Sequence, residues 1–347
     1  IRCYKFFEGA KFMGKSLQRD YYFDNARAIL IFFVVFGHLL QPYKSESPIL
    51  SALYLTIYSF HMPGFLFISG YFAKKIGEQG YLEKVSRKLL IPYFIFFAFF
   101  SFYYYFTGQT DKVTFDPFNP VFALWFLLTL FLFHVILVIV KDYKPYIVLP
   151  VAIIISLFAG FSSNINEYLS FSRTIIFFPI FYIGYLFQKR HTAFLRDKRL
   201  IPISIAILIS FFVIYYIHPI NADWLLGSTP YTSLEDGDQG LYSPLKRLVL
   251  YVIILVAMFS VFNLVPQGQH WFTYMGGRTL QVYLLHGLVI GVVRGFELYP
   301  FKEPISIMTY IYLIGLSALI VYILTTNFVV KWSNPIIHLK RPSQFNS

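Results

Sequence analysis

Residues 26–43, ARAILIFFVVFGHLLQPY, decide the fold class, because they form an apolar run with two basic side chains, Arg27 and His38, inside it. A helix needs about 20 apolar residues to cross the hydrocarbon core of a bilayer, and this run has nearly that length. Similar runs recur to the end of the chain, so the sequence predicts an all-α, polytopic membrane helix bundle with about ten transmembrane helices. The other runs cover residues 49–72, 88–107, 121–140, 146–161, 171–188, 200–217, 245–264, 279–294 and 304–330.

The composition excludes several classes of protein. The chain has 347 residues, of which 57% are hydrophobic and only 13% are charged, whereas a soluble domain carries roughly 25% charged residues. An ordinary globular enzyme, a disordered chain and a disulfide scaffold are therefore excluded. Cys3 is the only cysteine, so the sequence offers no internal disulfide and no CxxC motif. We expect no metal ion and no permanently bound cofactor.

The formal net charge of +12 is distributed in a pattern that predicts topology. Most of the Lys and Arg residues fall in alternate connections between the apolar runs, and cytoplasmic loops retain such residues. Both termini are therefore predicted to be cytoplasmic. The basic residues lie in short groups between apolar segments, which favours a bilayer as the partner and argues against nucleic-acid binding. We divide the chain into a cytoplasmic segment (1–23), a transmembrane domain (24–330) and a cytoplasmic tail (331–347).

The first apolar run places its polar side chains on one helical face. His38 follows Arg27 by eleven residues, which is about three turns plus 20°, or roughly 16 Å along the axis. Asp24 lies near the same face, roughly 21 Å from His38. Neither Asp24 nor Arg27 can touch His38 on a straight helix, so both serve a position nearer the cytoplasm.

This spacing has two interpretations. Arg27 suits the phosphates of a long donor whose thin arm reaches His38, and histidine is the usual general base near neutral pH. Alternatively, Arg27 snorkels to the membrane interface and His38 bonds a neighbouring helix.

Two further segments carry candidate residues near the inner face. In FHMPGFLFISGY (60–71), Ser69 and Tyr71 add polar groups, while Pro63 and Gly64 can interrupt the helix. Ser69-Gly70 is either a close packing point between helices or, less commonly, the place of a nucleophile. The basic loop that contains Arg87 and Lys88 suits either anionic lipid headgroups or the phosphates of a cytosolic donor.

The remaining candidates lie later in the chain. Trp125, in LWFL (124–127), fits an interfacial aromatic belt. Arg173 begins an apolar run and is either an interfacial anchor or the partner of an anionic group. Tyr283 and His286 lie in a run that follows Gly276 and Gly277, which places His286 in mid-membrane. A hydrogen bond to a neighbouring helix is the simplest role for a histidine at that depth.

Six segments, in order, resemble the motifs of the acyltransferase-3 family of bacterial integral-membrane acyltransferases, most closely its short members similar to fucose-4-O-acetylases. DNARAILIFFVVFGH (24–38) resembles the first-helix motif, in which ten residues separate an Arg from a His. HMPGFLFISGYFAKK (61–75) resembles the block that ends in Ser-Gly-aromatic. The others are SRKLLIPYF (86–94), LWFL (124–127), RTIIFFPIFYIGYLF (173–187) and YLLHG (283–287).

The resemblance implies transfer of an acyl group, most often acetyl, from cytosolic acetyl-CoA to a hydroxyl of a cell-surface or lipid-linked glycan, in a bacterial plasma membrane. It gives His38 the central catalytic role and Arg27 a role with the donor, and we expect Asp24 to belong with them to the catalytic residues. Arg27, Arg87 and Lys88 are then expected to hold the CoA phosphates. The expected substrate or oxyanion contacts are Ser69, Tyr71, Trp125, Arg173, Tyr283 and His286.

The resemblance departs from some relatives in one respect, because we expect no SGNH-type domain after the last apolar run. The chain is then expected either to acylate its acceptor directly or to pass the acyl group to a separate extracytoplasmic protein; a homo-oligomer is also open. A transporter that moves a glycan or small anion unchanged is the alternative function, and a sensor without chemistry is a third. Consumption of acetyl-CoA separates the enzyme from both.

Overall fold

The computed structural model describes residues 20–107, 110–113, 115–234, 240, 242–295 and 305–338. Every regular element in these ranges is helical, which confirms the predicted all-α fold class. The longer helices are α1 (Tyr22–Leu40), α2 (Pro48–Tyr58), α3 (His61–Phe72), α4 (Tyr81–Phe106), α5 (Trp125–Val140), α6 (Pro145–Ala159), α7 (Phe171–Leu186), α9 (Ile201–Ile217), α12 (Ser243–Leu264), α14 (Thr279–Gly295), α15 (Ile307–Leu324) and α16 (Asn327–His338). The short ones are η2 (Gln41–Tyr43), η3 (Phe122–Leu124), η4 (Tyr168–Ser170), η5 (Lys189–His191), α8 (Thr192–Leu195), η6 (Lys198–Leu200), α10 (Asp223–Leu226), α11 (Tyr231–Leu234) and α13 (Thr273–Gly276).

The described helices have the lengths and composition of membrane spans. Eight helical segments are long and apolar enough to cross a bilayer, and two shorter apolar helices, Pro145–Ala159 and Thr279–Arg294, accompany them. These segments fall on the ten predicted apolar runs. The chain is therefore a polytopic membrane protein, while the number of spans and the side on which each terminus lies stay predictions.

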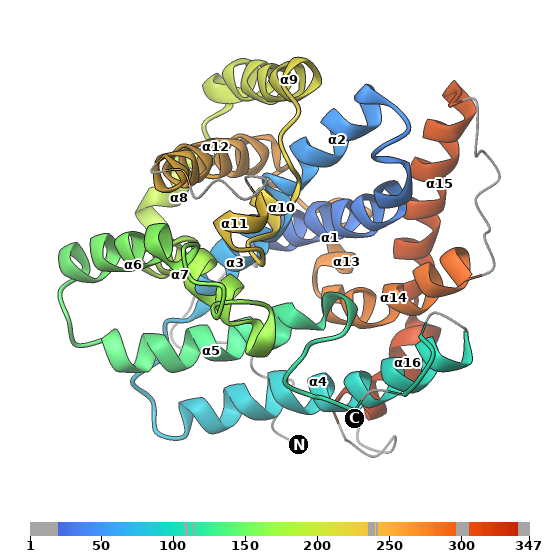
Figure 1. Ribbon diagram of the computed structural model, residues 1–347, viewed down its shortest axis with the longest axis horizontal. Coiled ribbons are helices and arrows are strands. Elements are labelled where there is room, and N and C mark those ends of the chain that lie inside the picture. Colours follow the sequence, from blue (N-terminus) through green and yellow to red (C-terminus); the bar gives the residue numbers. More distant parts are fainter. Residues whose placement is uncertain are drawn as a thin grey trace, which may run out of the picture.

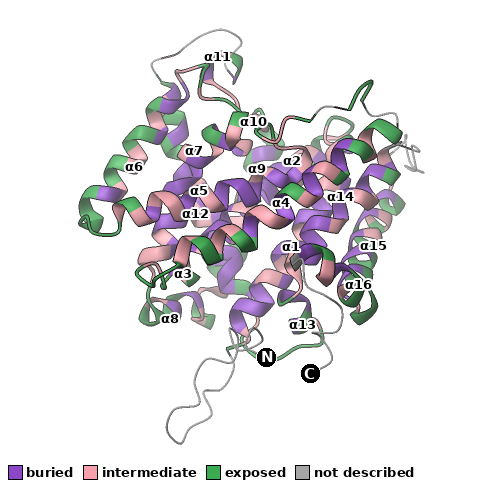
Figure 2. Cartoon of the chain, turned by 90° about the horizontal axis from the view of Figure 1, so that it is seen from below, coloured by how far each residue is buried: buried purple, intermediate pink, exposed green. Residues whose placement is uncertain are grey.

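Helix α1 lies in the interior of the bundle. It packs against α2, α3, α13, α14 and α15, and the ribbon places it at the centre of the molecule (Figure 1). The buried residues gather around it (Figure 2). Its first turn is fixed by Asn25, which is fully buried and whose Nδ2 donates to the carbonyls of Pro266 and Gly268 at 2.9 and 2.8 Å.

The predicted helix over 49–72 is two helices. Helix α2 ends at Tyr58 and α3 begins at His61. Pro63, which was expected to interrupt this segment, lies in the first turn of α3, so the interruption precedes it. Proline has no N–H to donate to the carbonyl four residues earlier, here Ser59, and the helix therefore ends near that residue.

The last predicted helix, 304–330, also divides. Helix α15 ends at Leu324, and α16 starts at Asn327 and crosses the boundary that we placed between the transmembrane domain and the tail. Arg278 donates to the carbonyl of Thr325 in the short connection. This side chain supplies a partner for one of the carbonyls that a helix end leaves unbonded.

Helix α9 packs at the edge of the bundle, against α2 and α12 (Figure 1). Ser204 and Tyr215 are its buried residues, whereas large apolar side chains such as Ile203, Ile209 and Ile217 are more than half exposed. Soluble monomers rarely expose such continuous apolar surface. A hydrocarbon environment around α9 accounts for it.

Two glycines allow α3 and α7 to touch through their backbones. A Cβ atom added at Gly70 would overlap the carbonyl oxygen of Phe181, and one added at Gly184 would overlap that of Phe67. Small residues at such crossings let membrane helices approach closely. Gly70 is therefore a packing point, as one interpretation of the Ser69-Gly70 pair predicted.

We predict that Gly70→Ala lowers the thermal stability of the protein in detergent, because α3 and α7 must separate to admit the methyl group. Overpacking of this kind costs about 1–3 kcal/mol. The matched control is Gly315→Ala in α15, where an added Cβ meets no atom within 4 Å. Size-exclusion chromatography after heating measures the monodisperse fraction. Equal midpoints for the two variants would refute the packing role of Gly70.

Candidate active site

His38 lies in the last turn of α1, where its side chain is partly exposed but its Nδ1 atom is buried. Nδ1 has no hydrogen-bond partner among the described residues. The rings of Phe122 and His286 lie against the imidazole, with centroids 4.8 and 5.3 Å away. A buried polar atom without a partner is costly, and a catalytic role is one explanation for keeping it, so we place the centre of the candidate site at this nitrogen.

His286 brings a second imidazole to the same place. It is fully buried in α14, and its Nδ1 lies 3.0 Å from the carbonyl oxygen of Val282. Because a carbonyl only accepts, Nδ1 carries the proton and a neutral His286 presents a lone pair at Nε2. That Nε2 atom is buried and has no partner in the described part of the chain. His286 therefore suits the acceptance of a proton better than the donation of a hydrogen bond to an oxyanion.

The ring of Phe122 contacts both histidines, and its backbone conformation is unusual. Its φ angle of 53° is in the left-handed region, which costs a non-glycine residue about 1–2 kcal/mol. Gly287 makes room for it, because an added Cβ there would lie 2.8 Å from the Phe122 ring. Tyr283 donates its hydroxyl to the carbonyl of Ala123 and so fixes η3 to α14. Such strain is typical of functional sites.

Trp125 and Arg173 lie farther along the same side of the bundle. The Tyr283 ring is 5.5 Å from Phe126, which in turn contacts Trp125. The Arg173 guanidinium lies 4.9 Å over the Trp125 ring, and its Nη2 pairs with Glu167 at 2.9 Å. These contacts occupy much of the cation, so the structure places Arg173 as an anchor of the bundle.

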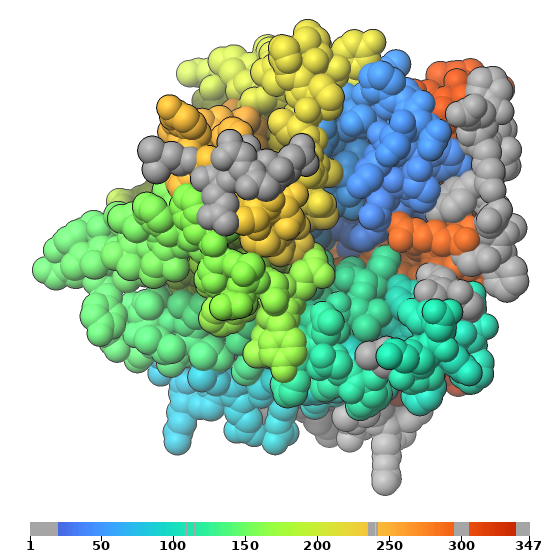
Figure 3. Space-filling model, viewed as in Figure 1, coloured from blue at the N-terminus to red at the C-terminus, as the bar shows by residue number. Residues whose placement is uncertain are grey.

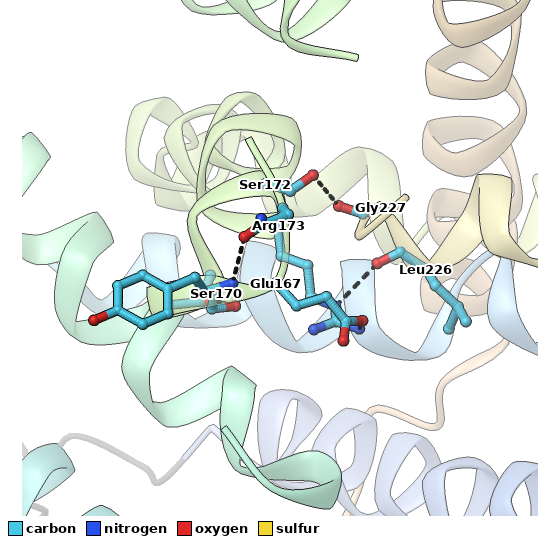
Figure 4. A network of polar contacts seen from close by, with 9 residues as sticks. Glu167, Ser170, Ser172, Arg173, Leu226 and Gly227 are labelled. Carbon is cyan, nitrogen blue, oxygen red and sulfur yellow. Dashed lines mark hydrogen bonds and ion pairs between the residues drawn. The ribbon is translucent and has the colours of Figure 1, made fainter. Parts of the chain in front are cut away.

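Arg173 and its neighbour also fix the segment that contains α10 (Figure 4). Arg173 Nε donates to the carbonyl of Leu226 at 3.3 Å, and Ser172 Oγ donates to that of Gly227 at 2.8 Å. From α12, the buried Arg247 donates to the carbonyl of Trp224 at 2.6 Å. Three side chains from two helices therefore hold the carbonyls of Trp224, Leu226 and Gly227.

The other end of α1 holds a separate polar cluster. Arg27 pairs with Asp24 at 2.5 Å, and its guanidinium lies 5.7 Å over the ring of Phe72. The positive charges of Lys88 and Arg27 are near enough to act on each other. Asp24 thus orients Arg27, and Lys88 adds charge beside it, whereas neither contacts His38.

Tyr71 belongs to this second cluster. Its ring stacks on that of Phe23 at 4.6 Å, which is roughly 22 Å from His38 along the helix. Lys74 Nζ lies 5.6 Å over the Tyr71 ring and 5.0 Å over that of Tyr185. Partial burial there lowers the pKa of the Lys74 ammonium below its ordinary value. Tyr71 therefore lies in the cluster near Arg27 and not beside His38.

Two predicted residues join neither cluster. Ser69 Oγ donates to the Phe65 carbonyl of its own helix at 2.8 Å. Arg87 is exposed and pairs with Glu83 one turn earlier at 2.8 Å. Residues 87 and 88 are consecutive, so their side chains leave α4 about 100° apart, and it is Lys88 whose charge interacts with that of Arg27.

The sequence analysis missed Arg294 and Gln41, which surround His38. Arg294 ends the apolar run predicted over 279–294 but was not singled out there; it lies in the last turn of α14, and its Nη2 donates to the His38 carbonyl at 3.0 Å. An arginine at the end of an apolar run is itself a functional candidate. That signal was available in GVVRG (291–295).

A polar pocket of about 250 Å³ opens beyond the His38 end of α1, which we call the Tyr54 pocket. Tyr54 stacks on Tyr58 at 4.0 Å, and Tyr58 packs against Gly37, the neighbour of His38. In the space-filling view the blue surface of this region adjoins the yellow surface near residue 220 (Figure 3). Its polar lining is Lys44, Ser45, Ser51, Tyr54, Asn221 and Asp223.

Comparison with known proteins agrees with this architecture. A family profile described as an acyltransferase domain matches residues 20–327. Nodulation protein NolL of Mesorhizobium japonicum is 28% identical over 200 residues, which cover 52% of each chain. Nodulation protein NolL of Sinorhizobium fredii is 50% identical over 58 residues, 16% of each chain. The chain thus spans about half the length of the first relative. No solved structure matches it significantly.

We predict that Arg173→Leu accelerates backbone hydrogen exchange in residues 221–228, because the segment loses one of its two bonds to α7. A hydrogen bond from a charged group contributes about 1.5–3 kcal/mol, so exchange should quicken about tenfold or more. Arg190→Leu is the control, since Arg190 is exposed and far along the chain from this segment. Unchanged exchange in Arg173→Leu would show that Arg173 does not hold the segment.

Proposed function

Since the chain belongs to the acyltransferase-3 family, we propose that this membrane acyltransferase transfers an acetyl group from cytosolic acetyl-CoA to a hydroxyl of a cell-surface or lipid-linked glycan. The observation that carries the proposal is the arrangement of two polar clusters at the two ends of one buried helix. Arg27 and Lys88 mark one end, while His38 and His286 mark the other. The two ends are roughly 16 Å apart along α1. We propose a bacterial plasma membrane as the location.

The cationic end suits the phosphates of the donor. Arginine presents a planar fork of donors that matches phosphate oxygens, and Asp24 holds that fork in place at Arg27. The adjacent Lys88 supplies a second cation. The pantetheine arm would lie along α1 and bring the thioester to His38. Acetyl-CoA acts in this scheme as a substrate, and no resident cofactor or metal is required.

His38 would act as the general base. It would take the proton of the acceptor hydroxyl while that oxygen forms a bond to the thioester carbonyl carbon. The tetrahedral intermediate would then expel the CoA sulfur, which recovers the proton from His38 and leaves as the thiol. His286 Nε2, a lone pair beside His38, would orient the hydroxyl or share the proton. Transient acetylation of His38 itself is the other route.

The Tyr54 pocket supports a sugar as the acceptor. Its lining combines hydroxyl, amide and charged groups, and a few polar groups that converge on a pocket suit a hydroxyl-rich ligand. It also lies at the His38 end of α1, whereas the cationic cluster lies at the opposite end. Acceptor and donor would therefore approach His38 from different sides. Whether a separate extracytoplasmic protein completes the transfer depends on which acceptor is used.

We predict that His38→Gln reduces the rate at which the protein releases CoA from acetyl-CoA by at least about 100-fold, the usual contribution of a general base. The assay uses purified protein in liposomes with radiolabelled acetyl-CoA. His218→Gln, an exposed histidine, should retain wild-type turnover. Label that stays on wild-type protein but not on His38→Gln would establish the acyl-histidine route. Wild-type protein that consumes no acyl-CoA would make a transporter the better hypothesis.

We predict that Arg27→Ala raises the KM for acetyl-CoA by about 10- to 100-fold, since a charge-assisted bond to phosphate contributes about 1.5–3 kcal/mol. Turnover at saturating donor should change much less. Arg190→Ala, which removes an exposed arginine, controls for the loss of one positive charge. An unchanged KM with reduced turnover would contradict the assignment of Arg27 to the donor.

A further inference from the structure

Arg294 is bonded to the helical turn that carries His38. Its Nη2 atom donates to the His38 carbonyl oxygen at 3.0 Å and to Gln41 Oε1 at 2.9 Å. Its Nε atom is buried and has no partner among the described residues. Among those residues, no carboxylate pairs with Arg294 within ion-pair distance. Among the described residues, the guanidinium of Arg294 therefore donates to two oxygens at the end of α1, the carbonyl oxygen of His38 and Oε1 of Gln41.

Gln41 connects this cation to the imidazole. It follows His38 by three residues, so the two side chains lie on neighbouring turns of one face. The Gln41 side chain also interacts with the His38 ring. An amide oxygen has two lone pairs and can accept from both a guanidinium and an imidazole N–H. The amide thus lies between Arg294 and His38.

We propose that Arg294 is a positioning residue that, through Gln41, fixes the tautomer and orientation of the His38 imidazole. This inference rests on the proposed function, in which His38 takes the proton of the acceptor. With Arg294 on one lone pair, the amide cannot turn its NH2 group toward the imidazole. One ring nitrogen of His38 then donates to Gln41, and the other keeps its lone pair for the hydroxyl. A base oriented by a third group is the general logic of activated catalytic sites.

A purely structural role makes a different prediction. A cation at a helix C-terminus stabilises the carbonyls of the last turn, and Arg294 does this at His38. If that were its whole role, removal of the side chain would lower stability and leave the turnover of the folded protein unchanged. Gln41→Leu separates the two roles, because it removes the amide and leaves the bond between Arg294 and the His38 carbonyl.

The chain offers a matched control in Arg278, at the other end of α14. Arg278 Nη1 donates to the carbonyl of Thr325, and Nη2 donates to Asn327 Oδ1 at 2.6 Å. It therefore makes the same kinds of bond, to one backbone oxygen and one amide oxygen. Arg278→Leu removes them without touching the turn of His38.

The first experiment compares Gln41→Leu, Arg294→Leu, the double variant and Arg278→Leu in liposomes, with rates normalised to folded protein. We expect kcat to fall about 10- to 100-fold in both single variants, since misplacement of a catalytic group by about 1 Å costs that much. The KM for acetyl-CoA should stay within about twofold. The double variant should be no slower than the slower single variant, because the two residues act as a unit. Arg278→Leu should retain kcat.

The second experiment does not depend on turnover. The protein has eight histidines, and ring-15N labelling with His38→Gln as the reference identifies the His38 resonances. We expect one tautomer in the wild type and in Arg278→Leu, and a mixture in Gln41→Leu and Arg294→Leu. An unchanged tautomer in these two variants, or an unchanged kcat in Gln41→Leu, would overturn the positioning role. If wild-type protein turned over no acyl-CoA, the proposed function would fail while the spectra still decided whether Arg294 orients His38.

Discussion

Helix α1 must carry charged and titratable groups through the interior of an apolar bundle, and the rest of the architecture depends on how that cost is met. A polar group buried without a partner costs several kcal/mol. At one end, Asp24 pairs with Arg27, and Asn25 bonds the 266–273 connection through three hydrogen bonds. At the other, Arg294 bonds the last turn. Because both ends are fixed, the distance from Arg27 to His38 is set by the rise of a helix and not by a mobile loop.

Close packing around α1 also leaves little room for water at the site. Gly276 lets α13 approach the carbonyl of Asp24, and Gly287 admits the Phe122 ring beside α14. The left-handed backbone at Phe122 keeps this ring against both histidines. Hydrogen bonds and charges act more strongly in such a low-dielectric place than in water. The strained backbone at Phe122 and the buried nitrogens of His38 and His286 therefore share one cause, which is the close packing that leaves little water around this end of α1.

Helix periodicity made much of this arrangement predictable. The apolar runs located the helices, and the spacing of Arg27 and His38 separated the two ends of the site before any contact was known. Periodicity predicts which face of a helix a side chain occupies but not which residue it contacts. It therefore did not reveal that Arg87 pairs with Glu83 or that Arg173 pairs with Glu167. A phenylalanine in the sequence also does not predict the left-handed φ angle found at Phe122. Arg294 was missed because it is the last residue of the apolar run predicted over 279–294, and a helix end does not by itself reveal which neighbour its side chain reaches.

The arginines of this protein show that burial depth alone does not decide function. Arg173 is nearly buried but bonds Glu167, Leu226 and the face of Trp125, and Arg278 bonds a helix end. Each therefore holds structure. Arg294 makes bonds of the same chemistry, yet both its acceptors belong to the turn of the one histidine whose Nδ1 is buried and unpartnered among the described residues. Its bond to the His38 carbonyl stabilises the end of α1, and its bond to Gln41 is the one through which we propose that it orients the His38 imidazole.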